Sequence, residues 1–241
     1  MTVNLLIADL NKLADPIRAT HSLRFFKTGP GEYGEGDKFL GLSVPEQRQI
    51  AKKYCRTISL KDTLKLLKNE HHEARFVALA ILVHKFEKGT KEEQKEIYHA
   101  YLAHTAFVSN WDLVDSSAHK IVGRHLLDKP RHPLYNLARS PLLWDRRIAI
   151  ISTFAFIAAG EYDDSLNLAK ALLRDKEDLI HKAVGWVLRE VGKRKANLLT
   201  DFLDEYAPVM PRTMLRYSLE KLSSQKRAHY LHLKLRAKIN P

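Results

Sequence analysis

The chain has 241 residues, 45% of them hydrophobic, so it can form one large domain or two small ones with a sizeable core. No stretch approaches the roughly 20 apolar residues of a membrane span, an acid comes too early for a signal peptide, and the single cysteine, Cys55, excludes an internal disulfide and a cysteine-rich zinc site. A net charge of +12 favours a polyanionic partner through attraction and counterion release, although a protein that is merely basic has the same composition.

Helical periodicity runs along almost the whole chain, and no run of alternating β-branched residues stands out. Capping boxes at Ser43–Glu46 and Thr90–Glu93, a weaker one at Ser59–Asp62, and two prolines, Pro141 and Pro211, mark helix starts. The pattern predicts an all-α protein with helices near residues 3–13, 16–26, 45–56, 60–69, 72–88, 91–104, 112–126, 133–139, 142–160, 163–174, 178–193, 197–206, 211–222 and 225–237.

Shorter and longer helices alternate from residue 60 onward. Near the starts of the longer ones lie four anchor residues separated by 36, 36 and 35 positions: Arg75, Trp111, Arg147 and Lys182. This spacing is typical of a helix-pair repeat, in which stacking completes a core that no pair can bury alone. We therefore expect residues 1–241 to form one solenoid domain of stacked antiparallel helix pairs, whose concave face offers a groove to an extended ligand.

The position four residues after each anchor shares a helix face with it. Two repeats carry aliphatic residues there, whereas the others carry Asp115 and Trp186. Departures from a buried pattern often mark a site. Trp111 and Asp115 together would place a flat apolar wall beside an anion, which suits a substrate with developing positive charge. A core tryptophan with a hydrogen-bonded aspartate is the alternative, and Asp112 can cap the same helix.

Two later segments combine cations with aromatic residues. Arg146 and Arg147 start a predicted helix, where a phosphate could bind, but Arg147 could instead pair with Asp115 of the neighbouring repeat. Lys182, Trp186 and Arg189 share one helix face. This stripe fits a groove for a phosphate backbone, and a packed tryptophan with snorkelling cations looks the same. Gly185, in mid-helix, allows close approach by either a neighbouring helix or a ligand.

Two other patterns do not support chemistry. Gly29–Gly34 matches G-x-G-x-x-G, but a helix end precedes it and no βαβ unit follows, so we interpret it as a flexible loop rather than a dinucleotide site. The closest histidine sets are His71 with His72 and His229 with His232. Neither set forms a pattern that would complete a tetrahedral metal site, so we expect exposed or helix-capping histidines and no metal.

Taken together, five segments resemble the AlkD-type DNA alkylation repair glycosylases, in order, between about residues 20 and 220. The matching segments are Phe39–Leu42, Pro45–Arg48, Trp111–Ser116, Trp144–Ile150 and Lys182–Glu190. The resemblance implies a HEAT-like helical-repeat solenoid that grips duplex DNA in a concave basic groove. It also implies hydrolysis of the N-glycosidic bond of cationic purines such as 7-methylguanine and 3-methyladenine, without a cofactor and without a base-extrusion pocket.

By motif position, the resemblance makes Asp115 the catalytic carboxylate, with Trp111 and Trp186 packed against the deoxyribose of the lesion. The residues expected to bind DNA are Arg147, Arg146, Lys182, Arg189, Arg48 and Tyr33. We expect a monomer in the cytoplasm, associated with the nucleoid through alkylated double-stranded DNA. A non-catalytic protein that binds damaged or branched DNA and a protein-binding scaffold are the alternatives.

Two departures from the family pattern stand out. Asn110 lies where relatives can have a second tryptophan. The loop from Thr28 to Asp37 is rich in glycine and difficult to register against the family, and Tyr33 is our candidate for its DNA-contacting aromatic. The family includes relatives with weak or absent glycosylase activity, and such loops are where they would differ.

Overall fold

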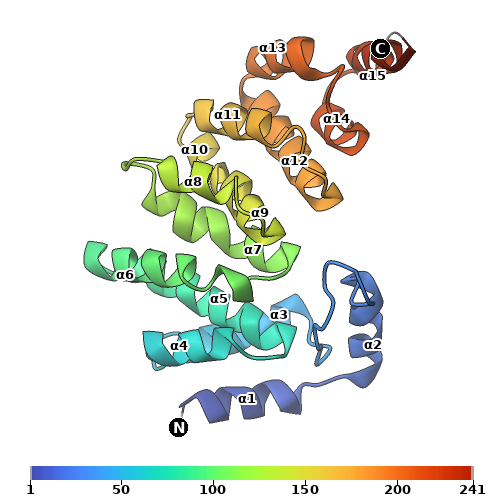
Figure 1. Cartoon of the computed structure of the whole chain (residues 1–241). Helices are drawn as coiled ribbons and strands as arrows, with labels where there is room; N and C mark the ends of the chain where they lie inside the picture. The colour runs from blue at the N-terminus through green and yellow to red at the C-terminus, as the bar shows by residue number, and fades with distance from the viewer. Residues whose placement is uncertain (1, 240–241) are drawn as a thin grey trace. The chain divides into compact units, whose positions relative to one another are not determined.

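The computed structural model describes the backbone of residues 2–239 and the side chains of residues 2–233. All regular structure within these bounds is helical, which confirms the all-α prediction, and the one β-type pairing is an isolated bridge between Lys38 and His71. The chain divides into two compact units, Met1–His125 and Leu126–Pro241, each with its own apolar core (Figure 1). None of the described helices combines the length and hydrophobicity that crossing a membrane requires.

Unit 1 is built around one long helix, α5, which is apolar on nearly every side and is therefore buried. The inner row consists of α3, α5 and α7, with α4 and α6 packed on α5 from outside and α1 against α3 and α5. Its elements are α1 (Thr2–Lys12), α2 (Pro16–Phe25), α3 (Val44–Tyr54), α4 (Leu60–Leu67), α5 (His72–Lys88), α6 (Lys91–Leu102), the 3-10 helix η1 (Thr105–Phe107), α7 (Trp111–Ala118) and the π-helical turn η2 (His119–Gly123).

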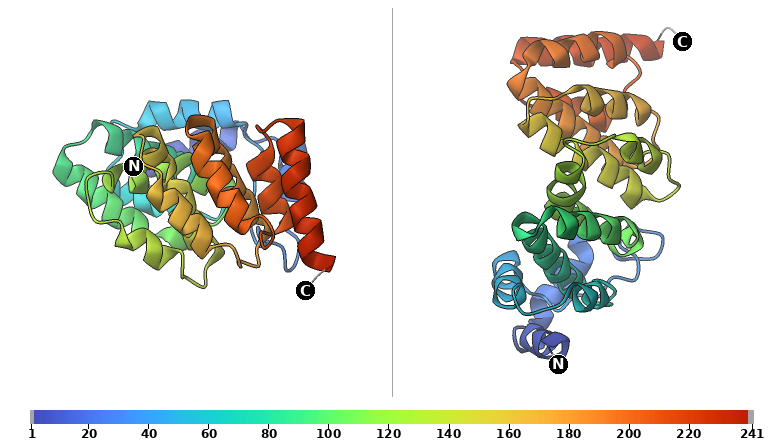
Figure 2. Two further views of the ribbon diagram at one scale, coloured as in Figure 1. Left: turned by 90° about the horizontal axis from the view of Figure 1, so that it is seen from above. Right: turned by 90° about the vertical axis from the view of Figure 1, so that its left-hand side faces the viewer.

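Unit 2 repeats this plan. Helices α9, α12 and α14 pack in that order along the inner row, with α8 on α9 and with α11 and α13 on α12 (Figures 1 and 2). Its elements are α8 (His132–Leu137), α9 (Leu143–Ser152), α10 (Phe154–Ala158), α11 (Asp163–Ala171), α12 (Asp178–Arg194), α13 (Ala196–Tyr206), α14 (Arg212–Leu219) and α15 (Ser224–Ile239). The helix-pair repeat is thus confirmed, and the four anchor residues all lie near the starts of inner helices.

Local signals set most helix ends. Both predicted capping boxes form, and Ser59 accepts a hydrogen bond from the amide of Asp62 at 3.0 Å. Two predictions were too long. The α-helix expected over 112–126 ends at Ala118, where the π-helical turn η2 follows, and the helix expected over 142–160 breaks at Thr153 into α9 and α10. The hydroxyls of Ser152 and Thr153 donate to the carbonyls of Ile148 and Ile150 at 2.6 and 2.7 Å, and such back-bonding bends helices.

The sequence left open whether Gly185 allows close approach by a neighbouring helix or by a ligand. A Cβ atom there would lie 2.5 Å from Cβ of Tyr217 and 2.6 Å from the carbonyl oxygen of Met214. Glycine is therefore required because α14 packs directly onto α12, and the close neighbour is a helix rather than a ligand.

Candidate functional site

Helix α7 presents the predicted tryptophan and carboxylate. Trp111 is its first residue, and the side-chain oxygen of Asn110 accepts the Trp111 amide at 2.8 Å. Asp115 follows one turn later on the same face, and both side chains are half-buried. An indole and a carboxylate are thus held side by side on one rigid helix at the surface of unit 1.

An aromatic cluster extends from Trp111 to the end of α2. The Trp111 ring lies 5.6 Å from the ring of Phe26, nearly parallel to it, and 5.8 Å from that of Phe25, edge to face. Phe25 is 65% exposed, so its ring lies at the surface of unit 1. A large exposed aromatic next to a candidate site is an expected ligand contact.

Sequence reasoning passed over Phe25 and named Tyr33 as the DNA-contacting aromatic, and DNA contact by Tyr33 stays a prediction. The Tyr33 hydroxyl donates to the carbonyl of Phe25 at 3.4 Å, so Tyr33 braces the end of α2. The available signal was the pair Phe25-Phe26 at a helix end, because two adjacent residues of a helix face different directions and cannot both be buried by one neighbour.

The glycine-rich loop folds on itself. The amides of Gly29 and Gly31 donate to the carboxylates of Glu32 and Glu35, both at 2.9 Å. A Cβ on Gly34 would lie 2.4 Å from the carbonyl oxygen of Phe26, so a side chain does not fit there. No strand precedes this loop in the described chain, and its fold offers no dinucleotide cradle. The last residue of the loop, Asp37, has a largely buried side chain.

Beneath the aromatic cluster lies a buried group of charges. His72, 2% exposed, has Nε2 2.8 Å from Oδ2 of Asp112 and Nδ1 3.4 Å from Oδ2 of Asp37. Arg75 donates to the other oxygen of Asp37 at 2.6 Å. The expectation that His72 is exposed or caps a helix was therefore wrong, because its carboxylate partners come from distant segments. Its neighbour His71 does occupy the N-cap position of α5.

Electrostatics inside this group favour a charged imidazole. Burial alone would lower the pKa of His72, but the carboxylates of Asp112 and Asp37 raise it to about 9. Burial likewise opposes ionisation of Asp37, and the hydrogen bond from His72 with the charge of Arg75 outweighs it, so the pKa of Asp37 is lowered. The raised pKa of His72 and the lowered pKa of Asp37 thus both favour the charged forms of this pair at neutral pH.

The predicted arginines of unit 2 are engaged within the protein. Arg147, 4% exposed, donates from Nη1 to the carbonyl of Leu179 at 2.5 Å, joining α9 to the start of α12. Arg146 donates from Nε to Asp175 at 2.6 Å and from Nη1 to the carbonyls of Ser140 and Pro141. These contacts show that Arg146 stabilises the loops before α9 and α12. DNA binding by either arginine stays a prediction.

The stripe on α12 is present as predicted. The Trp186 ring is half-buried, with its centroid 4.7 Å from that of Phe154. Lys182 lies 2.8 Å from Asp178, and Arg189 is paired with Glu220. All of these residues belong to unit 2, whereas Trp111 and Asp115 belong to unit 1. A shared site of the two tryptophans and Asp115 stays a prediction.

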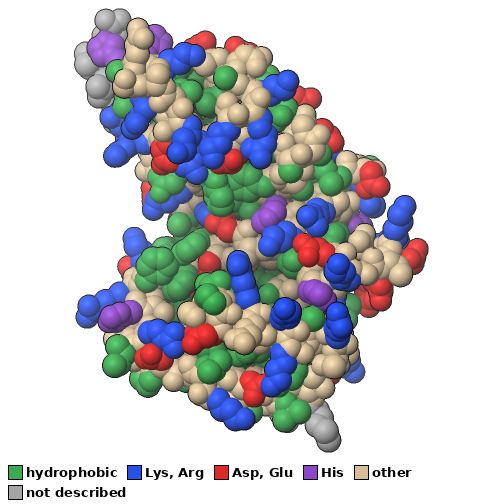
Figure 3. Space-filling model, turned by 180° about the vertical axis from the view of Figure 1, so that it is seen from behind, with side chains coloured by type: hydrophobic (Ala, Val, Ile, Leu, Met, Phe, Trp, Pro, Cys, Tyr) green, Lys and Arg blue, Asp and Glu red, His purple; other side chains and the backbone are tan. Residues whose placement is uncertain are grey.

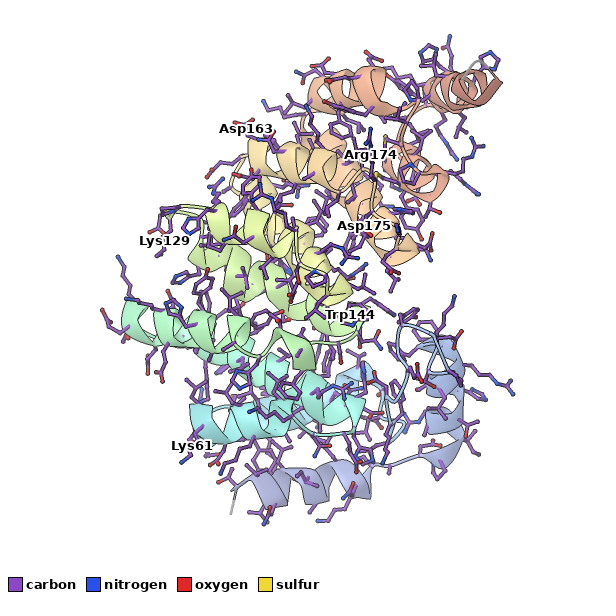
Figure 4. All side chains as sticks on the ribbon, in the orientation of Figure 1. Lys61, Lys129, Trp144, Asp163, Arg174 and Asp175 are labelled. Carbon is purple, nitrogen blue, oxygen red and sulfur yellow. The ribbon has the colours of Figure 1, made fainter. Side chains whose placement is uncertain are left out.

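Unit 2 also carries exposed arginines that sequence reasoning passed over. Each lies at the turn into an inner helix and has no ion-pair partner within the described residues: Arg139 before α9, Arg174 before α12 and Arg212 at the start of α14. Figure 4 shows Arg174 and Asp175 at the end of α11 opposite to Asp163. The repeat period itself, 35 residues between Arg139 and Arg174, was the signal that could have found them.

Other exposed cations gather near the C-terminal end of unit 2 (Figure 3), where a hollow of about 400 Å³ is lined by Thr213, Arg216, Tyr217, Glu220 and Arg227. In unit 1, Arg48 is exposed on α3. Among the described residues, no group of three His, Cys, Asp or Glu side chains is arranged to hold a metal ion. A concave basic groove along the whole chain stays a prediction.

These features define a helical-repeat protein with an aromatic and acidic candidate site on an inner helix. Residues 6–222 match the family model of the DNA alkylation repair enzymes, and the chain belongs to this family. Among solved structures, it is similar to a predicted DNA alkylation repair enzyme from Enterococcus faecalis, with 18% identity, a TM-score of 0.67 and coverage of 88% of this chain and 97% of the other. That likeness shows the shared fold. No curated protein sequence matches the chain.

Proposed function

We propose that this protein is a DNA N-glycosylase that removes cationic alkylated purines, of the 7-methylguanine and 3-methyladenine type, from double-stranded DNA in base excision repair. Membership of the DNA alkylation repair family supports a role in DNA repair. The observation that carries the finer assignment is Asp115 held one helical turn from Trp111, with exposed Phe25 beside that indole.

The reaction needs little acid catalysis from the protein. A purine alkylated at a ring nitrogen is already positively charged, so it leaves as a neutral base when it takes both electrons of the bond to C1′. Positive charge then develops on the sugar, where a carboxylate stabilises the oxocarbenium-like transition state and orients the attacking water. Water forms the new bond to C1′ and releases a proton. In this scheme Asp115 is the catalytic carboxylate.

Aromatic rings would stabilise the same positively charged species. An indole face attracts a cation through its ring quadrupole. We assign this contact to Trp111 and Phe25 in unit 1 and to Trp186 in unit 2. Phe25 takes the place that we expected for Tyr33, because Phe25 is exposed next to Trp111.

Cations along unit 2 would hold the phosphate backbone. The arginines without ion-pair partners at the turns into α9, α12 and α14 are exposed, whereas Arg146 and Arg147 form hydrogen bonds within the protein. We therefore assign backbone contacts to Arg139, Arg174 and Arg212. The remaining cations of the stripe, Lys182 and Arg189, and Arg48 of unit 1 are further candidates. In this scheme a monomer binds cytoplasmic, nucleoid-associated DNA and needs no cofactor.

The test compares Asp115→Asn with wild type in single-turnover release of 7-methylguanine from duplex DNA. Loss of a charge that acts only in the transition state should leave binding intact while excision slows roughly a hundredfold or more. Asp201→Asn, an exposed site on α13, is the control for the same change of charge. Unchanged excision by a folded Asp115→Asn protein would remove Asp115 from this role. DNA binding without excision by wild type would instead indicate a non-catalytic DNA-binding protein, and no binding to any DNA a protein scaffold.

A further inference from the structure

The backbone of Trp111 is fixed from both sides by one buried group. Asn110, completely buried, donates from Nδ2 to Oδ2 of Asp37 at 3.2 Å. On the other side, Asp112 contacts Nε2 of His72, and His72 contacts the same oxygen of Asp37 through Nδ1. The residues before and after Trp111 thus meet at the pair formed by Asp37 and His72.

The ring of Trp111 is connected to the same histidine by stacking. The ring centroid of Phe26 lies 5.6 Å from that of the indole and 4.8 Å from that of the imidazole. Phe39 covers the imidazole as well, with centroids 4.8 Å apart and planes 24° from parallel. A charged imidazole in contact with aromatic rings is favourable, so His72 supports the indole through packing as well as through its neighbours' hydrogen bonds.

The group also explains why the loop from Thr28 to Asp37 folds tightly. Its last residue, Asp37, accepts from Arg75 and Asn110 and faces His72, which binds the loop to α5 and to the start of α7. A shift of the loop would therefore move the α7 N-terminus and, with it, the indole.

We propose that His72 and Asp37 are positioning residues that hold Trp111 in the orientation needed to contact substrate, and that the glycine-rich loop serves to deliver Asp37 to this pair. The role in excision rests on the proposed function, whereas the control over the indole is a property of the free protein. His72 does not reach the surface and acts only through Trp111 and its helix.

The first experiment needs no substrate. In a Trp144→Phe/Trp186→Phe protein, Trp111 is the only tryptophan, so its emission spectrum and acrylamide quenching report its surroundings. We expect His72→Gln and Asp37→Asn each to increase the quenching constant at least twofold. The matched control is His125→Gln, because His125 is also buried in unit 1 and stacks on Tyr98 with centroids 4.0 Å apart. Equal quenching in His72→Gln and His125→Gln would overturn the proposal.

The second experiment is a double-mutant cycle on excision. If His72 acts through the indole, His72→Gln should slow single-turnover excision about tenfold in the native background and less than twofold in Trp111→Ala. A general loss of structure would give equal, additive effects in both backgrounds and would refute the positioning role. If His72→Gln does not fold, Asp37→Asn carries both tests, since it keeps the size of the side chain. If wild type excises nothing, the proposed function fails, while the quenching experiment still decides the inference.

Discussion

The buried histidine makes stability depend on pH in a definite direction. His72 has a pKa of about 9 in the folded protein and an ordinary value of 6.5 when the chain unfolds. A raised folded pKa means that the folded state binds the proton more tightly. The resulting stability is fully present below pH 6.5 and is lost as pH rises through 9. The difference between the two pKa values corresponds to roughly 3 kcal/mol in the free energy of unfolding.

Urea denaturation at pH 6 and pH 10 measures this contribution. Other groups titrate in the same interval, so the quantity to compare is the change in unfolding free energy between the two pH values in wild type and in His72→Gln. Wild type should lose about 3 kcal/mol more than the variant. His125→Gln, which keeps His72, should show the wild-type pH dependence. Identical pH dependence in wild type and His72→Gln would show that His72 is not held as an imidazolium.

Two further predictions concern the binding of DNA. Phe25→Ala should weaken binding and slow excision on the order of tenfold, because the ring no longer stacks on the substrate. The melting temperature should stay near that of wild type, since Phe25 is 65% exposed. A lower melting temperature with unchanged binding would contradict this prediction. Replacing Arg139, Arg174 and Arg212 together by glutamine should make DNA binding less sensitive to salt. The magnitude of the slope of log K against log salt should decrease by about 0.9 for each phosphate that is no longer neutralised. The charge-matched control removes three exposed lysines of the outer helices, Lys61, Lys91 and Lys95, and an equal decrease of the slope there would indicate a general charge effect.

The helices were predictable because their signals are local. Capping boxes and apolar periodicity operate within a few residues, so expected and observed helix ends agree to within two residues at most positions. The break at Thr153 was missed because a hydroxyl can either face solvent or bond back to the helix, and the sequence around it fits both.

The candidate site was only partly predictable. Trp111 and Asp115 are visible in the sequence because they share one helix face. The surroundings of His72 are not, because its partners Asp37 and Asp112 lie 35 and 40 residues away. Arg146 illustrates the same limit: an arginine at a helix start fits a phosphate or an acid equally well, and an acid 29 residues later, Asp175, binds it in the folded chain.

The amide of Asn110 fits the balance of buried charge around it. His72 and Arg75 offset Asp37 and Asp112, so the group is neutral overall, and the amide of Asn110 adds a donor to Asp37 without adding charge. Asn110→Asp has nearly the same shape and can still cap α7, but it places a carboxylate against Asp37. The free energy of unfolding at pH 8 should fall by about 1–3 kcal/mol.

The pH dependence of that decrease distinguishes charge from shape. Burial beside Asp37 should raise the pKa of the new carboxyl in the folded state, so the decrease should shrink as the pH falls and the carboxyl becomes protonated. Asn110→Ser also caps a helix but adds no charge, so any destabilisation it causes should be independent of pH. Denaturation at pH 5 and pH 8 compares the two variants. If Asn110→Asp is destabilised by the same free energy at both pH values, the shape and hydrogen bonding of the amide rather than the neutrality of the group explain why aspartate does not fit before Trp111.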